Sequence, residues 1–420
     1  MTTSEQQEQV PPPSSSGTIL SRLSRWLDRD RWPAADDTRS LFTARPTDVA
    51  ANRVAKTWSE RYLAGDDDQK RRLLAGLAEV SAVLDPSEGY GLRLFRRLYA
   101  HTDSLELLVQ MRADMLRWRN QVAGLTVLER ELKTLLSSWF DVGMLELRRI
   151  TWDSPASLLE KLIIYEAVHE IRSWDDLRNR VAEHRRCYAF FHPRMEKAPL
   201  IFVEVAFSSH MADNVQALLD PDAPADNPDK AKWAIFYSIS NTQRGLRGIS
   251  FGNFLLKRVV EELLEEFPRL KGFATLSPIP GFANWLAQQD HETMLDTSTD
   301  KNDRQRTRDD GLTGQDWADQ LQQAATAEPD DNLKRSGLRL AAHYLKTMKH
   351  DHPLDPVARF HLGNGARIER LNWAADTSTK GLAQSFGIMA NYVYDLDQLD
   401  DNLEQLAAGK IKTGRNMRWM

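Results

Sequence analysis

Residues 50–136 carry apolar side chains at three- and four-residue spacing, which is the pattern of amphipathic helices. Each apolar stripe is broad enough to face a neighbouring helix, so the pattern predicts a helical bundle over residues 41–138. Thr126 and Glu129 have the spacing of a capping box at the start of the last helix. The bundle lacks paired Glu and His positions of the kind that hold metals, so we expect it to be structural. Its apolar positions are Leu73, Leu77, Val80 and Leu84; Leu92, Phe95, Leu98 and Tyr99; Leu105, Leu108, Met111, Met115 and Leu116; and Leu128, Leu132, Leu135 and Leu136.

From Trp139 onward the pattern changes to short strands interspersed with helices. The strands are predicted at residues 143–150, 187–192, 200–207, 233–240 and 272–276, and the clearest helix at residues 254–267. Such a mixture indicates a mixed α/β domain over residues 139–420, with the boundary near Ser138. The predicted fold class for the whole chain is α+β.

Two polar segments fall outside this pattern. Residues 1–40, with Pro11, Pro12 and Pro13 and a run of serines, are expected to form a disordered leader. Residues 290–335 are dense in Asp, Thr, Gln and Arg, and we expect a mobile surface insertion with one short helix around Trp317 to Ala324.

Composition narrows the functional classes. A length of 420 residues suits two or three domains, and 41% hydrophobic with 27% charged residues is an ordinary globular balance. The formal net charge of −5 argues against a general nucleic-acid binder. No apolar run approaches the ~20 residues that span a bilayer, and the N-terminus does not resemble a secretory signal. The single cysteine, Cys187, excludes an intrachain disulfide and is interpreted as a buried apolar residue.

The densest functional signal is the segment 238–254, where an apolar strand leads through a loop with three glycines into a long helix. Glycines permit close approach of the backbone to a ligand, and free N–H groups at a helix start favour anions. Arg244 and Arg247 add positive charge there. The segment is neither a Walker loop nor a dinucleotide-binding fingerprint, so a flexible strand–helix turn is the alternative to a phosphate site.

Two further residues are candidates for catalysis. Ser277 precedes Pro278, an order that suits a helix cap, and the same geometry could stabilise negative charge on a substrate oxygen. His361 lies among apolar residues before a Gly-Asn-Gly turn, where it would be a core residue or a proton donor or acceptor. The spacing of His350 and His352 is poor for a metal site, and we expect none.

Long stretches around these residues resemble the malonyl-CoA decarboxylase family. The most specific is FYSISNTQRGLRGISFGNFLLKRVVEELLEEFPRLKGFATLSPIPGF, and PVARFHLGNGARIERLNWAADTS, GIMANYVYDL and SSWFDVGMLELRRITWDSP add three more blocks. The resemblance covers most of the chain from about Ala50, apart from the insertion at residues 290–335.

The resemblance implies a helical N-terminal domain used in oligomer contacts, and a catalytic domain related to the acetyl-CoA-dependent N-acetyltransferases. It implies conversion of malonyl-CoA to acetyl-CoA and carbon dioxide with no metal or organic cofactor, in a homo-oligomer expected to be a tetramer. Ser277 and His361 would be catalytic and would contact substrate, and Tyr394 would lie near them and also bind substrate. The implied CoA-binding residues are Arg247, Gly248, Ile249, Ser250, Phe251, Gly252 and Asn253.

The expected location is cytoplasmic, because the C-terminus lacks the Ser-Lys-Leu peroxisomal signal and no transit peptide is evident. The expected partners are malonyl-CoA and acetyl-CoA, with no nucleic acid and no membrane. In the expected mechanism the thioester carbonyl accepts the electrons left by carbon dioxide, and His361 protonates the resulting enolate. The alternatives are a CoA-dependent N-acyltransferase and a non-catalytic acyl-CoA sensor.

Overall fold

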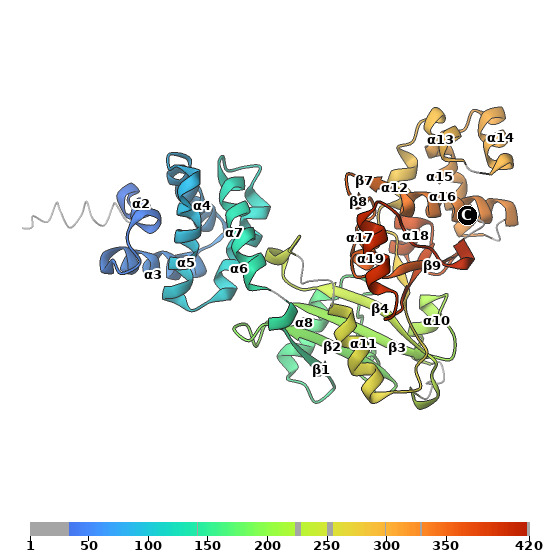
Figure 1. Ribbon diagram of the computed structural model, residues 1–420, viewed down its shortest axis with the longest axis horizontal. Helices are drawn as coiled ribbons and strands as arrows, with labels where there is room; N and C mark the ends of the chain where they lie inside the picture. Colours follow the sequence, from blue (N-terminus) through green and yellow to red (C-terminus); the bar gives the residue numbers. More distant parts are fainter. Residues whose placement is uncertain are drawn as a thin grey trace, which may run out of the picture. The chain divides into compact units, whose positions relative to one another are not determined.

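The computed structural model describes residues 33–140, 142–222, 228–249, 255–298, 300–327 and 330–417. The chain divides into two compact units, Met1–Lys133 and Thr134–Met420. The division lies inside helix α7 (Leu125–Trp139), a few residues before the boundary expected near Ser138. Figure 1 labels the elements of both units.

The described part of the first unit is helical, as its apolar spacing predicts. Most of the predicted apolar positions lie in its core: Leu77, Leu98, Met111 and Leu132, for example, are fully buried. The exceptions are half-buried, namely Val80, Leu84, Leu92, Tyr99 and Leu116. The helices are α2 (Ala35–Thr43), α3 (Val49–Ala64), α4 (Asp67–Ala82), α5 (Tyr90–Thr102), α6 (Leu105–Trp118) and the first part of α7, with the short 3₁₀ helix η2 (Pro86–Glu88) between α4 and α5.

Helix α2 starts at Ala35 and therefore shortens the predicted leader, of which residues 1–32 lie outside the described part of the chain. Leu41 and Phe42 on this helix are fully buried, which explains why the segment is ordered despite its polar flanks.

The predicted capping box at Thr126 is wrong, because α7 starts one residue earlier, at Leu125. Glu129 instead accepts hydrogen bonds from Arg112, with Arg112 Nε 2.9 Å and Nη2 2.8 Å from Glu129 Oε1. The guanidinium is almost fully buried, so this ion pair joins α6 to α7 where a lone charge would be costly.

The second unit is built on a mixed sheet, and this confirms the α+β class. Its strand order is β1-β2-β3-β4-β5-β10-β6, and β9 also pairs with β10. Only β4 and β5 run parallel among the described pairs of this sheet. The strands are β1 (Glu146–Ile150), β2 (Arg185–Phe191), β3 (Ile201–Ser208), β4 (Trp233–Asn241), β5 (Gly272–Thr275), β6 (Ser277–Pro278), β9 (Arg367–Asn372) and β10 (Met389–Tyr394), and a separate hairpin comprises β7 (Met348–Lys349) and β8 (His352–Pro353).

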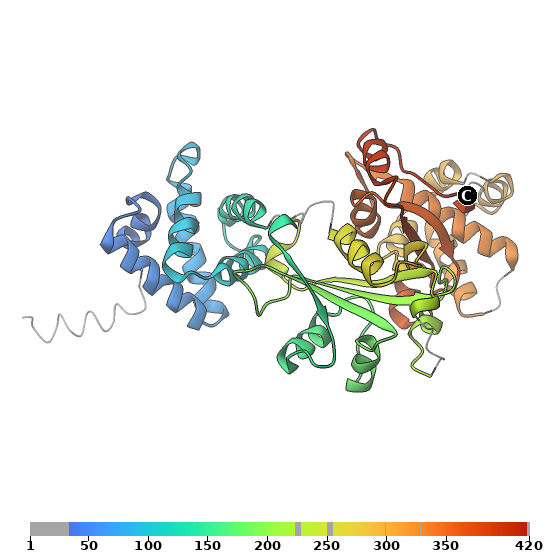
Figure 2. The same ribbon diagram turned by 60° about the horizontal axis from the view of Figure 1, so that its bottom comes forward.

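Different helices cover the two faces of this sheet. Helices α8 (Ala156–Tyr165) and α9 (Trp174–Arg180) lie on one face, and α11 (Leu255–Glu266) lies on the other (Figure 2). Leu159, Leu162 and Leu177 pack on the first face with Cys187 and Phe202. Successive side chains of a strand point to opposite faces of the sheet, and helices cover both faces. This explains why β2 and β3 are buried along their whole length.

The prediction that residues 290–335 are mostly mobile is wrong, but the short helix expected around Trp317 to Ala324 is present. This segment forms α13 (His291–Thr297), α14 (Lys301–Asp310), α15 (Gly314–Ala325) and the start of α16 (Asp331–Lys346). Trp317 is buried and its Nε1 donates to Thr307 Oγ1 at 3.2 Å, while Arg339 on α16 pairs with Asp300 and Asp303. A few buried anchors and ion pairs therefore order a largely polar segment.

The remaining helices complete this unit. They are α10 (Val215–Leu219), α12 (Phe282–Ala287), α17 (Pro356–Gly363), α18 (Thr379–Ser385) and α19 (Leu399–Ala407), with the 3₁₀ helices η3 (Val142–Met144), η4 (Pro228–Lys230), η5 (Arg244–Leu246) and η6 (Arg415–Met417). Among the described residues, no helix combines the length and the apolar character needed to cross a bilayer.

Candidate active site

The parallel strands β4 and β5 separate where β5 ends, part-way along β4. They pair from Trp233 with Gly272 to Phe236 with Thr275, and Leu276 N–H then donates to Phe236 O at 3.1 Å. The register between β3 and β4 shifts next to Tyr237, the position of a β-bulge. Beyond this point β4 continues along β3, whereas β6 pairs with β10.

A cavity of about 200 Å³ lies where these strands separate. It is smaller than the roughly 300–1,000 Å³ pockets that enclose drug-sized ligands, so it suits a short acyl group better than a nucleotide. Most of its wall is apolar, and Ser277 and His361 supply polar groups. Its lining residues are Val168, Phe236, Tyr237, Ser238, Ile239, Asn241, Ser277, Pro278, Pro356, Val357, Phe360 and His361.

Ser277 and His361 are 84 positions apart in sequence and form a hydrogen-bonded pair in this cavity. Ser277 Oγ lies 3.0 Å from His361 Nε2 and 2.8 Å from Thr275 Oγ1. On the other side of the imidazole, His361 Nδ1 lies 2.8 Å from the Tyr394 hydroxyl. Both ring nitrogens therefore have a partner, and a single chain of hydrogen bonds joins the four residues.

Burial determines the protonation of this group. His361 is 3% exposed, and its ring stacks on Tyr392 with centroids 4.5 Å apart. Removal of water disfavours the imidazolium and lowers the pKa of His361 to about 3. Burial likewise raises the pKa of Tyr394 well above its usual value. At neutral pH the histidine and the tyrosine are both uncharged.

Helix α17 positions His361 because its N-terminus is firmly held. Asp355 is the N-cap, and its Oδ1 accepts from the N–H groups of Val357 at 2.9 Å and Ala358 at 2.8 Å. Pro356 takes the first helical position, where its missing N–H costs nothing. His361 follows on the second turn and is buried against β10.

Ser277 is not the helix cap that its Pro neighbour suggests. It belongs to β6, where it pairs with Ala390 of β10, and the following helix α12 starts only at Phe282. Strand pairing rather than capping therefore aims the Ser277 hydroxyl at the imidazole.

Comparison with known proteins gives this geometry a context. The malonyl-CoA decarboxylase N-terminal domain matches residues 49–140, and the malonyl-CoA decarboxylase C-terminal domain matches residues 143–419. The chain belongs to the malonyl-CoA decarboxylase family. Mitochondrial malonyl-CoA decarboxylase of Rattus norvegicus is 38% identical over 352 residues, covering 77% of this chain and 70% of the rat protein. Mitochondrial malonyl-CoA decarboxylase of Anser anser anser is 35% identical over 431 residues, covering 95% of this chain and 81% of the goose protein.

Solved structures of the family agree over nearly the whole chain. Malonyl-CoA decarboxylase from Cupriavidus metallidurans is 50% identical with a TM-score of 0.82, and the match covers 93% of this chain and 99% of that one. The Rhodopseudomonas palustris protein is 38% identical with a TM-score of 0.77, and the match covers 92% of this chain and 98% of that one. The expected cytoplasmic location and homotetramer stay predictions, and the two vertebrate relatives are named as mitochondrial.

The glycine-rich loop implied by the family resemblance is partly described. After β4 the chain forms η5, Gly248 takes a positive φ of 73°, and Ile249 is buried. Ser250, Phe251, Gly252 and Asn253 lie outside the described residues. Since Asn241 lines the cavity, the loop begins next to the Ser277–His361 pair, and its role in CoA binding stays a prediction.

Sequence reasoning missed two residues of this decarboxylase-family site. Thr275 contacts Ser277, and its position two residues earlier in an extended segment could have indicated this. Glu166 accepts hydrogen bonds from Ser238 Oγ at 2.7 Å and Ser240 Oγ at 3.1 Å. Its other carboxylate oxygen accepts from the N–H groups of Val168 and His169, so Glu166 fixes the loop that brings Val168 to the cavity wall.

Other candidate residues lie outside this site. Cys187 is fully buried in β2, as predicted, and burial raises the pKa of its thiol. His350 and His352 are exposed in the β7–β8 hairpin. Among the described residues, no group of three or more His, Cys, Asp or Glu side chains is arranged to hold a metal.

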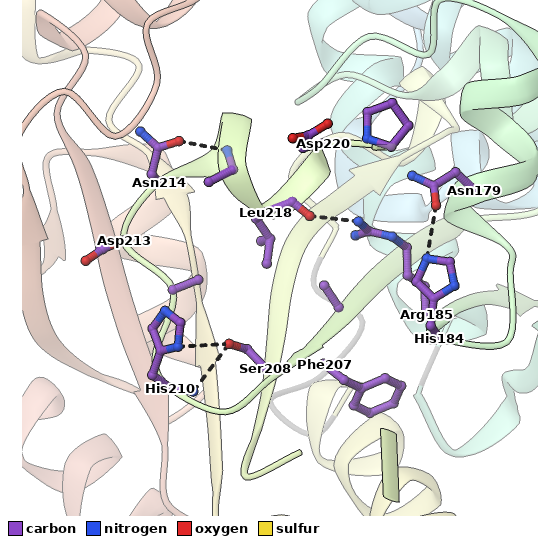
Figure 3. Close-up of a pocket in the computed structure, with 14 residues that line it drawn as sticks. Asn179, His184, Arg185, Phe207, Ser208, His210, Asp213, Asn214, Leu218 and Asp220 are labelled. Carbon is purple, nitrogen blue, oxygen red and sulfur yellow. Dashed lines mark hydrogen bonds between the residues drawn. The ribbon is translucent and has the colours of Figure 1, made fainter. Parts of the chain in front are cut away.

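A second cavity, of about 290 Å³, lies beside α10 and contains none of the predicted site residues. His184 and His210 lie on opposite sides of it (Figure 3). His184 Nε2 lies 3.0 Å from Asn179 Oδ1, and Arg185 donates to Leu218 O at 2.7 Å. These contacts hold His184 and one nitrogen of Arg185, whereas Arg185 Nε and Nη1 are buried without a hydrogen-bond partner among the described residues.

Proposed function

We propose that this chain converts malonyl-CoA to acetyl-CoA and carbon dioxide in the cavity that holds Ser277 and His361. The observation that carries the proposal is the buried Ser277–His361 pair in a cavity the size of a short acyl group. Membership of the malonyl-CoA decarboxylase family supports it. The acyl end of the substrate enters the cavity, and the CoA phosphates lie at the loop of residues 245–253, near the start of α11.

The bond that breaks joins the malonyl C2 atom to its carboxylate. Its electron pair moves to the thioester carbonyl, giving an enolate, so the substrate supplies its own electron sink and no cofactor is required. Ser277 donates a hydrogen bond to an oxygen on which charge develops. The apolar wall from Phe236, Val357 and Phe360 disfavours the localised carboxylate charge more than the delocalised enolate.

His361 supplies the proton that completes acetyl-CoA. Because the pKa of His361 is about 3, its donor at neutral pH is a neutral N–H group rather than an imidazolium. An enolate carbon is basic enough to take a proton from such a donor, directly or through the Ser277 hydroxyl. As Nε2 gives up its proton, Tyr394 donates to Nδ1. The overall reaction consumes one proton, so the site takes up one proton from solvent in each turnover, and neither imidazolate nor tyrosinate remains.

The catalytic unit is proposed to be related to the acetyl-CoA-dependent N-acetyltransferases. The support is local: β4, a glycine-containing loop, α11 and β5 follow one another, and the two parallel strands separate beside a cavity. Such a gap lets an acyl thioester lie between two strands whose backbone groups are no longer paired.

Incubation with malonyl-CoA alone tests the function. Mass spectrometry should detect acetyl-CoA and carbon dioxide in equal amounts without an amine acceptor. An N-acyltransferase would leave malonyl-CoA unchanged until an amine is added, and an acyl-CoA sensor would bind it without turnover. Either result would overturn the proposal.

A further inference from the structure

Thr275 is a second hydroxyl partner of Ser277, buried behind the reacting pair. It is fully buried as the last residue of β5, and its Oγ1 lies 2.8 Å from Ser277 Oγ. Thr275 does not line the cavity, so substrate would meet Ser277 first. Any effect of Thr275 on the reaction therefore passes through Ser277.

The Thr275 side chain and carbonyl are both held by β10. Tyr392 N–H donates to Thr275 Oγ1 at 3.1 Å, and Asn391 Nδ2 donates to Thr275 O at 2.7 Å. Asn391 is itself fixed, since its Oδ1 accepts from Arg370 Nε at 3.1 Å and Asn372 Nδ2 at 2.8 Å. The oxygen that Ser277 meets is thus held by a network of buried hydrogen bonds.

The hydrogen bonds of the four hydroxyl and imidazole groups run in one direction. Ser277 Oγ donates to Thr275 Oγ1 at 2.8 Å. Because its single proton is used there, Ser277 Oγ is the acceptor for His361 Nε2–H, and His361 Nδ1 accepts from the Tyr394 hydroxyl.

We propose that Thr275 is a positioning residue for decarboxylation, a role that rests on the proposed function. Its hydroxyl accepts the Ser277 proton in the resting chain, which holds Ser277 Oγ in place. Ser277 Oγ is thereby fixed as the acceptor of His361 Nε2–H, the N–H group that the proposed reaction uses.

The experiment compares Thr275→Val, which keeps the shape and loses the hydroxyl, with Thr275→Ser, which keeps the hydroxyl. We expect kcat for malonyl-CoA to fall roughly ten- to hundredfold in Thr275→Val, with KM changed less than about threefold. Thr275→Ser should restore kcat to within about threefold of the wild type. Thr275→Ala is measured alongside and should resemble Thr275→Val, so that poor folding of one variant still leaves a test.

Two controls separate positioning from stability. Thr307→Val removes another buried hydroxyl, which accepts from Trp317 in the insertion, and should lower the melting temperature with kcat unchanged. The double variant Thr275→Val, Ser277→Ala should have the same kcat as Ser277→Ala, because Thr275 acts through Ser277.

A further loss of kcat in the double variant would contradict the inference, and so would wild-type kcat in both Thr275→Val and Thr275→Ala. Wild-type protein that forms no acetyl-CoA would instead refute the proposed function.

Discussion

The uncharged state of His361 leads to a specific prediction for the pH dependence of turnover. The pKa of a histidine in water is near 6.5, and burial lowers that of His361 to about 3. The lowered pKa of a base means that the neutral form persists as the pH falls, until the pH approaches 3. Lowering the pH from 7.5 to 5 should therefore leave His361 neutral and kcat nearly unchanged.

The two possible pKa values predict very different turnover at pH 5. With a pKa of about 3, roughly 1% of His361 is protonated at pH 5, whereas a histidine with a pKa of about 6.5 would be roughly 97% protonated. If only the neutral form is active, the second case lowers kcat by about thirtyfold and the first by almost nothing.

The assay is the initial rate of acetyl-CoA formation at saturating malonyl-CoA, so that changes in CoA phosphate charge act on KM. Circular dichroism at each pH shows whether the protein is still folded. This control is needed because His361 takes up a proton in the unfolded chain but stays neutral in the folded one. Below pH 6.5 that difference lowers the free energy of unfolding by about 1.4 kcal/mol per pH unit for His361 alone. A kcat that falls about thirtyfold between pH 7.5 and 5 in folded protein would refute the assignment of a neutral His361.

Three other substitutions test separate parts of the structure. Ser277→Ala should lower kcat at least about tenfold with an unchanged melting temperature in thermal unfolding, since Ser277 caps no helix; wild-type kcat would contradict its role. Arg247→Ala should raise KM for malonyl-CoA several-fold with kcat little changed, and an unchanged KM would argue against phosphate binding at this loop. Trp317→Ala should destabilise the insertion by about 3–5 kcal/mol, visible as earlier proteolysis of residues 290–335, and wild-type resistance would contradict the role of this anchor.

The fold was predictable where apolar periodicity is strong. The helices of the first unit and the strands β2, β3 and β4 follow their patterns closely. The insertion was not, because α14 has only Thr307 buried and its order depends on α16, where Arg339 pairs with Asp300 and Asp303. Contacts of this kind join segments that no local pattern relates.

The site shows the same division. The chemical character of Ser277 and His361 could be inferred from residue type, but their 3.0 Å contact could not, because 84 residues separate them. Their pairing depends on β6 and α17 both packing against β10. The family resemblance placed Ser277 and His361 in one active site in advance, but it did not predict their contact. Thr275 was missed, although its position two residues before Ser277 in an extended segment could have indicated its contact.

The most direct test of the proposed chemistry is turnover by His361→Asn. This change keeps a polar side chain of similar size and removes the imidazole that joins Ser277 to Tyr394. We predict that kcat for acetyl-CoA formation falls by at least about a hundredfold while the Kd for acetyl-CoA changes less than about threefold. A His361→Asn protein that decarboxylates malonyl-CoA at the wild-type rate would contradict the account.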